Sequence, residues 1–74
     1  MVDFKKIIKI NSKVRFGKPC IRNTRISVFD VLSWLASGMS IIEILEDYPE
    51  LNELDIYACL AYAAQRENSI RVAS

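Results

Sequence analysis

Residues 27–67 read SVFDVLSWLASGMSIIEILEDYPELNELDIYACLAYAAQRE, and they carry the signals of three short helices. A short polar residue stands before each predicted helix with an acid three positions later: Ser27 and Asp30, Ser40 and Glu43, Asn52 and Asp55. The polar side chain can accept a hydrogen bond from a free backbone N–H group, and the acid lies at the positive end of the helix dipole. These pairs predict three helix starts.

Apolar residues in the same stretch recur at helical spacing, which predicts helices over 28–37, 41–47 and 53–67. Their apolar stripes are Val28, Val31, Leu32 and Leu35; Ile41, Ile44, Leu45 and Tyr48; Ile56, Cys59, Leu60 and Ala63. Gly38 ends the first helix and Pro49 ends the second. Three short helices with tight connections predict a mainly α, trihelical body whose second and third helices resemble a helix-turn-helix pair.

The first 27 residues have a different character, because they are rich in β-branched residues and broken by glycine, proline and asparagine. Residues 6–10 are predicted to form a short strand. Residues 20–26 are predicted to form a small hairpin in which Asn23 takes the left-handed conformation. Two short strands are marginal alone, so we expect them to pack on the helices or pair with a second chain.

Charge is divided unevenly along the chain. Residues 1–27 hold eight Lys and Arg against one Asp, a net +7, whereas residues 28–74 hold two Arg against eight acids, a net −6. Such asymmetry is typical of a protein that binds nucleic acid or a charged partner. Three interpretations stay open for the basic segment: contact with phosphates, pairing with an acidic protein or a second copy, and plain surface charge.

The residues needed for catalysis are scarce. The chain has no histidine, two cysteines about forty residues apart, and only two glycines, so neither a common general base nor a zinc site nor a phosphate-binding glycine loop is expected. We therefore expect no enzyme activity, no metal and no cofactor. No signal peptide or membrane span is recognised, and reduced thiols in a cytoplasmic location are expected.

Candidate binding residues fall into two sets. The candidate nucleic-acid contacts are Lys5, Lys6, Lys9, Lys13, Arg15, Lys18, Arg22 and Arg25, with Tyr62, Gln65 and Arg66 on a face of the third helix expected to be exposed together with Ala58. The candidate protein contacts are Ile8, Ile10, Trp34, Glu43, Glu46 and Asp47. Trp34 lies off the apolar stripe of its helix, so it is either an interface anchor or covered by the N-terminal strands. The acids that begin the third helix count against simple insertion of that helix into DNA.

Residues 17–28, GKPCIRNTRISV, resemble the signature of the domain-of-unknown-function family DUF433. Further matching segments follow, LASGMS at 35–40, EILEDYPEL at 43–51 and AYA at 61–63, so that the resemblance runs from about residue 8 to residue 64. Asn23 replaces a glycine of the pattern, Ser27 a proline and Asn52 a threonine. The resemblance implies a homeodomain-like trihelical fold with small N-terminal strands.

The resemblance also implies a function, that of an antitoxin in a type II toxin–antitoxin pair. Such a protein would neutralise a PIN-like ribonuclease toxin by direct binding and repress its own operon by binding promoter DNA as a dimer or larger oligomer. A protein-only adaptor without DNA contact and an oligomeric scaffold remain the alternatives. We expect one domain, with a basic segment at 1–27, a helical body at 28–68 and a short tail at 69–74.

Overall fold

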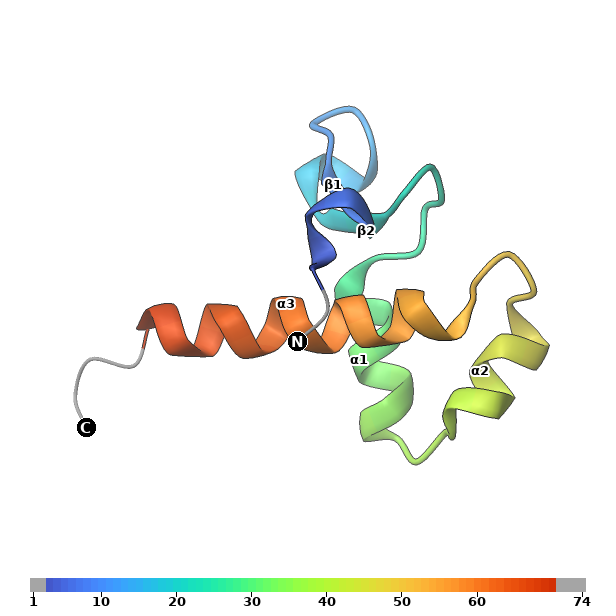
Figure 1. Ribbon diagram of the computed structural model, residues 1–74. Coiled ribbons are helices and arrows are strands. Elements are labelled where there is room, and N and C mark those ends of the chain that lie inside the picture. The colour runs from blue at the N-terminus through green and yellow to red at the C-terminus, as the bar shows by residue number, and fades with distance from the viewer. Residues whose placement is uncertain (1–2, 71–74) are drawn as a thin grey trace.

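The computed structural model describes residues 3–70 of the chain, with side chains described through residue 66. Its elements are η1 (Phe4–Lys6), β1 (Ile8–Ile10), η2 (Arg15–Gly17), β2 (Pro19–Ile21), α1 (Val28–Ala36), α2 (Ile41–Asp47) and α3 (Glu53–Ile70) (Figure 1). The mainly helical class with short N-terminal strands is confirmed, and α2 has the predicted bounds. The third helix is longer than the predicted 53–67, because α3 continues through Ile70, and residues 71–74 of the predicted tail lie outside the described part.

The three predicted helix starts form as capping pairs. In α1, the Ser27 hydroxyl accepts from the Asp30 backbone N–H at 3.0 Å, and the Asp30 carboxylate accepts from the Ser27 backbone N–H at 3.0 Å. Ser40 and Glu43 make the same reciprocal pair at α2. At α3, Asn52 and Asp55 do so at 2.9 and 3.0 Å. Each pair satisfies backbone donors that the helix itself cannot, and so fixes where the helix begins.

The two strands form an antiparallel pair in which Ile8 lies opposite Ile21 and Ile10 opposite Pro19. β1 is shorter than the predicted 6–10 strand because residues 4–6 form the 3-10 turn η1. A tight turn follows β2, closed by a hydrogen bond of 2.9 Å from the Thr24 N–H to the Ile21 carbonyl, and Cys20 bridges to Ser27 beyond it. The predicted hairpin of residues 20–26 is thus present, and its first strand, β2, also pairs with β1 on its other edge. We use the word hairpin below for β1, β2 and this turn together.

The left-handed residue of this turn is Arg22 at φ 42°, so the prediction for Asn23 is wrong. The local preference of asparagine is overridden by long-range contacts of the Arg22 guanidinium, which donates to the Asp55 carboxylate and, at 3.2 Å, to the Glu50 carbonyl. Those contacts hold Arg22 at the first central position of the turn. Tertiary contacts can maintain such a conformation in a residue that would avoid it in isolation.

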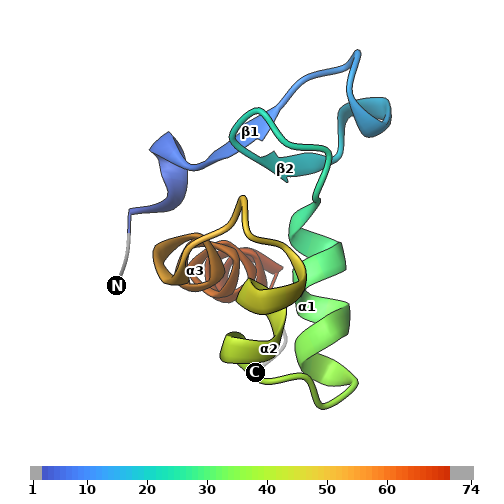
Figure 2. The same cartoon turned by 90° about the vertical axis from the view of Figure 1, so that its right-hand side faces the viewer.

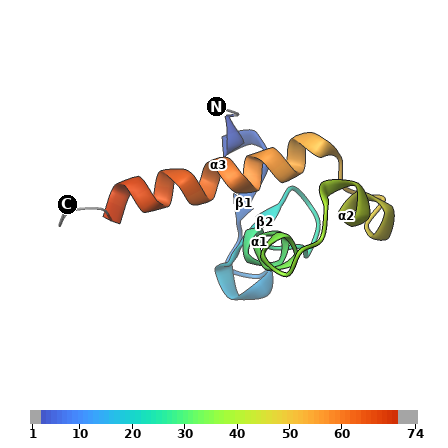
Figure 3. The same ribbon diagram turned by 90° about the horizontal axis from the view of Figure 1, so that it is seen from below.

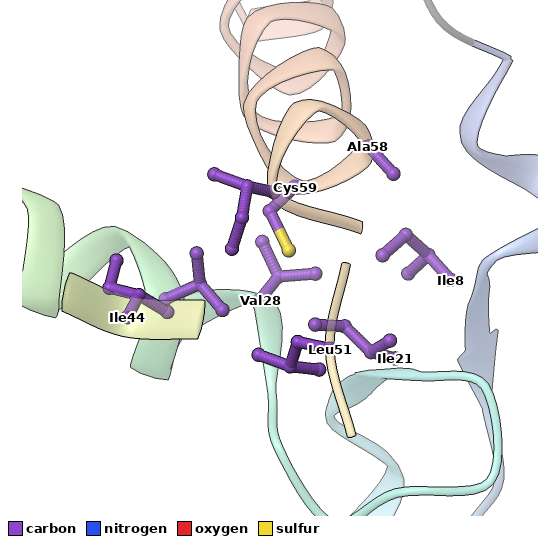
Figure 4. Close-up of a cluster of buried hydrophobic side chains, with 9 residues drawn as sticks. Ile8, Ile21, Val28, Ile44, Leu51, Ala58 and Cys59 are labelled. Carbon is purple, nitrogen blue, oxygen red and sulfur yellow. The ribbon is translucent and has the colours of Figure 1, made fainter. Parts of the chain in front are cut away.

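The β1–β2 pair lies over one side of α3, while α1 runs alongside that helix and α2 lies on the side away from the strands (Figure 2). The core forms where these layers meet, as the close-up shows (Figure 4). Its buried members come from every layer: Ile8, Ile21, Val28, Val31, Ile44, Leu51, Ile56, Ala58 and Cys59. The N-terminal strands are therefore part of the single core, as their marginal size requires.

The face of α3 predicted to be exposed is covered in its first part, at Ala58 and in part at Tyr62, and is exposed at Gln65 and Arg66. Ala58 and Asp55 are fully buried, because η1 and β1 pack onto this side of the helix. The Phe4 ring meets the half-buried Tyr62 ring edge to face at 5.3 Å. Leu60, predicted to lie in the core, is instead 40% exposed. Packing of the N-terminal segment has rotated the buried face of α3 away from the stripe that its apolar residues alone predict.

The second half of α3 extends past the rest of the molecule (Figures 1 and 3). Among the described residues, no helix combines the length and the apolar character that crossing a bilayer requires.

Candidate nucleic-acid interface

Arg22 is the first of two basic residues that the fold itself uses. Its guanidinium pairs with the Asp55 carboxylate, which is fully buried and already accepts from the Asn52 backbone N–H. The arginine side chain is 37% exposed, so the pair joins the surface of the hairpin to the interior at the start of α3. Arg22 therefore has a structural role, because its positive charge neutralises a buried carboxylate of the same chain and is less available to a partner.

Arg15 repeats this arrangement at the start of α1. It has φ 51°, donates to the Asp30 carboxylate at 3.1 Å and to the Arg25 carbonyl at 2.7 Å. Partial burial by itself would raise the pKa of Asp30, but hydrogen bonds from the Ser27 backbone, Arg15 and the Ser27 hydroxyl bring that pKa below its usual value. The carboxylate thus stays ionised, and both aspartates that cap helices in this way hold a left-handed arginine.

The other six cations of the N-terminal segment are exposed and lie on the hairpin end of the molecule. We call them the basic end: Lys5, Lys6, Lys9, Lys13, Lys18 and Arg25. Among residues 3–66, none of these side chains takes part in an ion pair. Their charge is therefore available to an anionic partner.

An open hollow of about 620 Å³ lies in the basic end, between the loop of residues 11–18 and the turn of residues 22–24. Lys9 and Lys18 line it together with Asn11, Ser12 and Asn23. In the described part of the chain, the side chains of Lys9, Ser12, Lys18 and Asn23 make no hydrogen bond to other protein groups. The hollow therefore presents two ammonium groups with amide and hydroxyl donors that are free to bind a polar anion.

Phe16 and Phe29 are exposed aromatic residues of the basic end that the sequence pattern did not identify as candidate binding residues. Phe16 is 98% exposed on a loop where Arg15, Phe16 and Gly17 all have positive φ, at 51°, 58° and 80°. Phe29 is 69% exposed and lines a second hollow of about 310 Å³ with Lys18 and Pro19. The available signal was the position of both residues: Phe16 is the one aromatic inside the basic loop, and Phe29 lies off the apolar stripe of α1.

The acidic candidates lie on α2. Glu43, Glu46 and Asp47 are all exposed, and we call them the acidic face. Hydrogen bonds from the Ser40 backbone and hydroxyl hold the pKa of Glu43 below its usual value. No cluster of three or more His, Cys, Asp or Glu side chains that could hold a metal ion occurs in the described residues.

The remaining protein candidates are divided between surface and interior. Trp34 is half-buried and stacks on Tyr48 with ring centroids 4.3 Å apart, so a residue at the end of α2 covers part of its ring. Ile8 belongs to the core, whereas Ile10 is 66% exposed at the end of β1. Of the six protein candidates, Ile10 and the acidic face are therefore the exposed ones.

On α3, Arg66 is exposed and lies 5.7 Å from the Tyr62 ring centroid, with a hydrogen bond of 3.5 Å to the Tyr62 hydroxyl. Gln65 is exposed beside it. Tyr62 packs on Phe4 of η1, the element that also carries Lys5 and Lys6, and none of the three α3 residues lines the hollow. The α3 candidates are therefore separate from the candidates around the hollow.

Both cysteines are free and buried, as predicted. Burial, reinforced by the nearby Asp55 charge, raises the pKa of the Cys59 thiol to about 12. The thiol therefore stays protonated near neutral pH, the form that is a poor nucleophile.

Comparison with known proteins places this geometry in a family. Residues 8–63 match the family described as "Protein of unknown function (DUF433)". The fold is similar to the crystal structure of a DUF433 member protein from Anabaena variabilis, with a TM-score of 0.81 and 33% sequence identity over 89% of this chain. The match spans 65% of the length of that protein. No curated protein matches the chain.

Proposed function

Because the chain belongs to the DUF433 family, we propose that it is the antitoxin of a type II toxin–antitoxin pair, in which the basic end binds operator DNA and the acidic face binds a PIN-like ribonuclease toxin. The observation that carries this proposal is the separation of exposed charge. Six unpaired cations lie on the hairpin end and three exposed acids lie on α2. Two oppositely charged surfaces suit two different partners, one of them a polyanion.

The geometry favours DNA contact through the hairpin end over contact through α3. In a helix-turn-helix protein the second helix of the pair enters the major groove by its N-terminal end. Here that helix would be α3, whose start carries the exposed acids Glu50 and Glu53, and whose Ala58 lies under the hairpin. We propose that the homeodomain-like arrangement of helices acts as a scaffold for the basic end.

The DNA role is tested with a duplex from the chain's own promoter. Lys13→Gln with Lys18→Gln removes two exposed charges, and we expect binding at about 0.1 M salt to weaken about tenfold and the slope of log K against log[salt] to fall by about 2. The measurement is fluorescence anisotropy across a salt series. An affinity of the unaltered protein that stays flat with salt contradicts the proposal.

The matched control places the same net-charge change on the helical body. Ser33→Glu with Ile42→Glu also lowers the charge by two at exposed positions of α1 and α2. It should keep the full salt slope, because it removes no phosphate contact. Association of the unaltered protein with itself at low salt, without DNA binding, would favour the oligomeric scaffold in its place.

The toxin role is tested by coexpression with a PIN-like ribonuclease encoded beside the chain. Glu46→Gln with Asp47→Asn removes two acids that take no part in a cap, and we expect association with the toxin to slow about tenfold at low salt. Ser33→Lys with Ala64→Lys changes the net charge equally elsewhere and should have a smaller effect. Toxin binding with no shift of promoter DNA would favour the protein-only adaptor.

A further inference from the structure

The Phe16 loop combines backbone strain with full exposure of an aromatic ring. Phe16 and the preceding Arg15 are non-glycine residues in the left-handed region, a conformation that costs of order 1–3 kcal/mol at each such residue. The Phe16 ring is 98% exposed and has no aromatic partner among the described residues. The Arg15 contact with Asp30 holds the loop in this shape. The fold thus fixes an apolar ring in solvent, where it buries almost no surface against the part of the chain that the structure describes.

The surroundings of this ring are cationic and polar. Val14 and Lys18, two residues away on either side, both line the hollow of about 620 Å³. Lys18 also lines the smaller hollow together with Phe29, so one lysine borders both hollows. A volume of this size lies within the range of sites that hold small molecules such as a nucleotide. Aromatic rings interleaved with lysines are typical of surfaces that bind single strands.

From this juxtaposition we propose that the basic end binds a single-stranded segment of nucleic acid, with a base stacked on Phe16 and the adjoining nucleotide seated in the hollow. Lys9 and Lys18 neutralise its phosphate, and the amides of Asn11 and Asn23 face the base or sugar. The inference goes beyond the proposed function, because it gives the surface that binds operator DNA a second occupant, an unpaired strand. It rests on the proposed function for the attraction of a polyanion to this surface.

Two features favour a single strand over a duplex as the occupant. A stacking ring needs the flat face of a base, which is hidden between neighbours in a duplex and open in an unpaired strand. The amides and hydroxyl lie within a concave surface between two loops, where an unpaired nucleotide can enter. RNA and DNA share this chemistry, and the test includes both.

The experiment compares 12-nucleotide single-stranded RNA and DNA, of a sequence unrelated to the promoter, with a DNA duplex of the same sequence, by anisotropy at fixed salt. We expect the better of the two single strands to bind at least about tenfold more tightly than the duplex. Phe16→Ala should weaken single-strand binding about tenfold, and Phe16→Trp should restore it. Because no phosphate contact is lost, the salt slope of Phe16→Ala should be unchanged. A 2-aminopurine base in the strand should lose fluorescence on binding the unaltered protein and not on binding Phe16→Ala.

Ile42→Ala is the matched control, because Ile42 is 70% exposed on α2, away from the basic end. It should leave both affinities unchanged. Equal affinity for duplex and single strand, or an effect of Phe16→Ala no larger than that of Ile42→Ala, overturns the inference while leaving DNA binding by the basic end intact. A loss of toxin binding in Phe16→Ala with nucleic-acid binding unaltered likewise overturns it. Absence of all nucleic-acid binding removes both proposals.

Discussion

Arg22→Gln is expected to destabilise the protein by about 3 kcal/mol, because it leaves the Asp55 carboxylate buried without its charged partner. Asp55 is fully buried, and the Arg22 guanidinium neutralises its charge. Glutamine is a shorter side chain, but like arginine it is an L-residue that is unbranched at Cβ, so the left-handed φ of 42° costs about as much as before. The decrease in the free energy of unfolding therefore measures the effect of removing the guanidinium group. For a domain of this size, the melting temperature should fall by roughly 12–24 °C.

Arg15→Gln supplies a control that the fold itself provides. Arg15 is also left-handed and also pairs with a capping aspartate, but Asp30 is 28% exposed and Arg15 32% exposed. Water can solvate Asp30 once the arginine is gone, so we expect a loss of about 1 kcal/mol or less. The two variants differ mainly in the burial of the carboxylate, which makes their difference a measure of desolvation.

Urea denaturation of five proteins completes the test: the unaltered chain, Arg15→Gln, Arg22→Gln, Asp55→Asn, and the double variant that combines Arg22→Gln with Asp55→Asn. Asparagine at position 55 retains an oxygen that can accept from the Asn52 N–H without carrying charge. The double variant should therefore be more stable than Arg22→Gln alone, by about 1–2 kcal/mol. Equal losses for Arg22→Gln and Arg15→Gln would contradict the buried-charge explanation.

The helices were predictable because their signals are local. Ser27 with Asp30 and Ser40 with Glu43 each act within four residues, and both capping boxes form as expected. The turn residue was not predictable in the same way. Asn23 has the better intrinsic preference for left-handed angles, but Arg22 contacts Asp55, 33 residues away, and that contact decides the turn. Sequence spacing carries no information about such a pair.

The sequence predicted the positive charge of the candidate site but not the arrangement of its residues. Clustering of lysines in the first 27 residues indicated a basic surface, and six of its eight cations are exposed. The burial of Ala58 depends on how η1 and β1 pack on α3, which helical periodicity cannot reveal. Exposure of Phe16 depends on three successive left-handed residues, which only Gly17 suggests from its residue type. The hollow depends on both loops and appears only in three dimensions.

Ile21→Ala is expected to destabilise the protein by about 3–4 kcal/mol. We expect the hairpin and the helices of this variant still to unfold together in one transition. Ile21 is fully buried on β2, where it and its register partner Ile8 join the hairpin to the core formed by the helices. Truncation leaves a cavity at this junction, and a two-stranded sheet has little stability apart from its packing. Ile10→Ala removes the same atoms from a residue of the same hairpin that is 66% exposed, and should cost less than about 1 kcal/mol.

The single tryptophan shows whether the hairpin and the helices unfold together. Trp34 stacks on Tyr48, so its fluorescence reports on the packing of α1 against the end of α2, away from the β1–β2 pair. If the hairpin is integral to the core, the urea unfolding curve measured by Trp34 fluorescence should coincide with the curve measured by far-ultraviolet circular dichroism. Ile21→Ala should then lower the urea midpoint of both curves by roughly 2–3 M. A Trp34 transition unchanged by Ile21→Ala would instead make the hairpin an appendage that folds on a finished helical body. In that case the basic end could detach without loss of the helices, and its cations would no longer be held in the arrangement on which nucleic-acid binding depends.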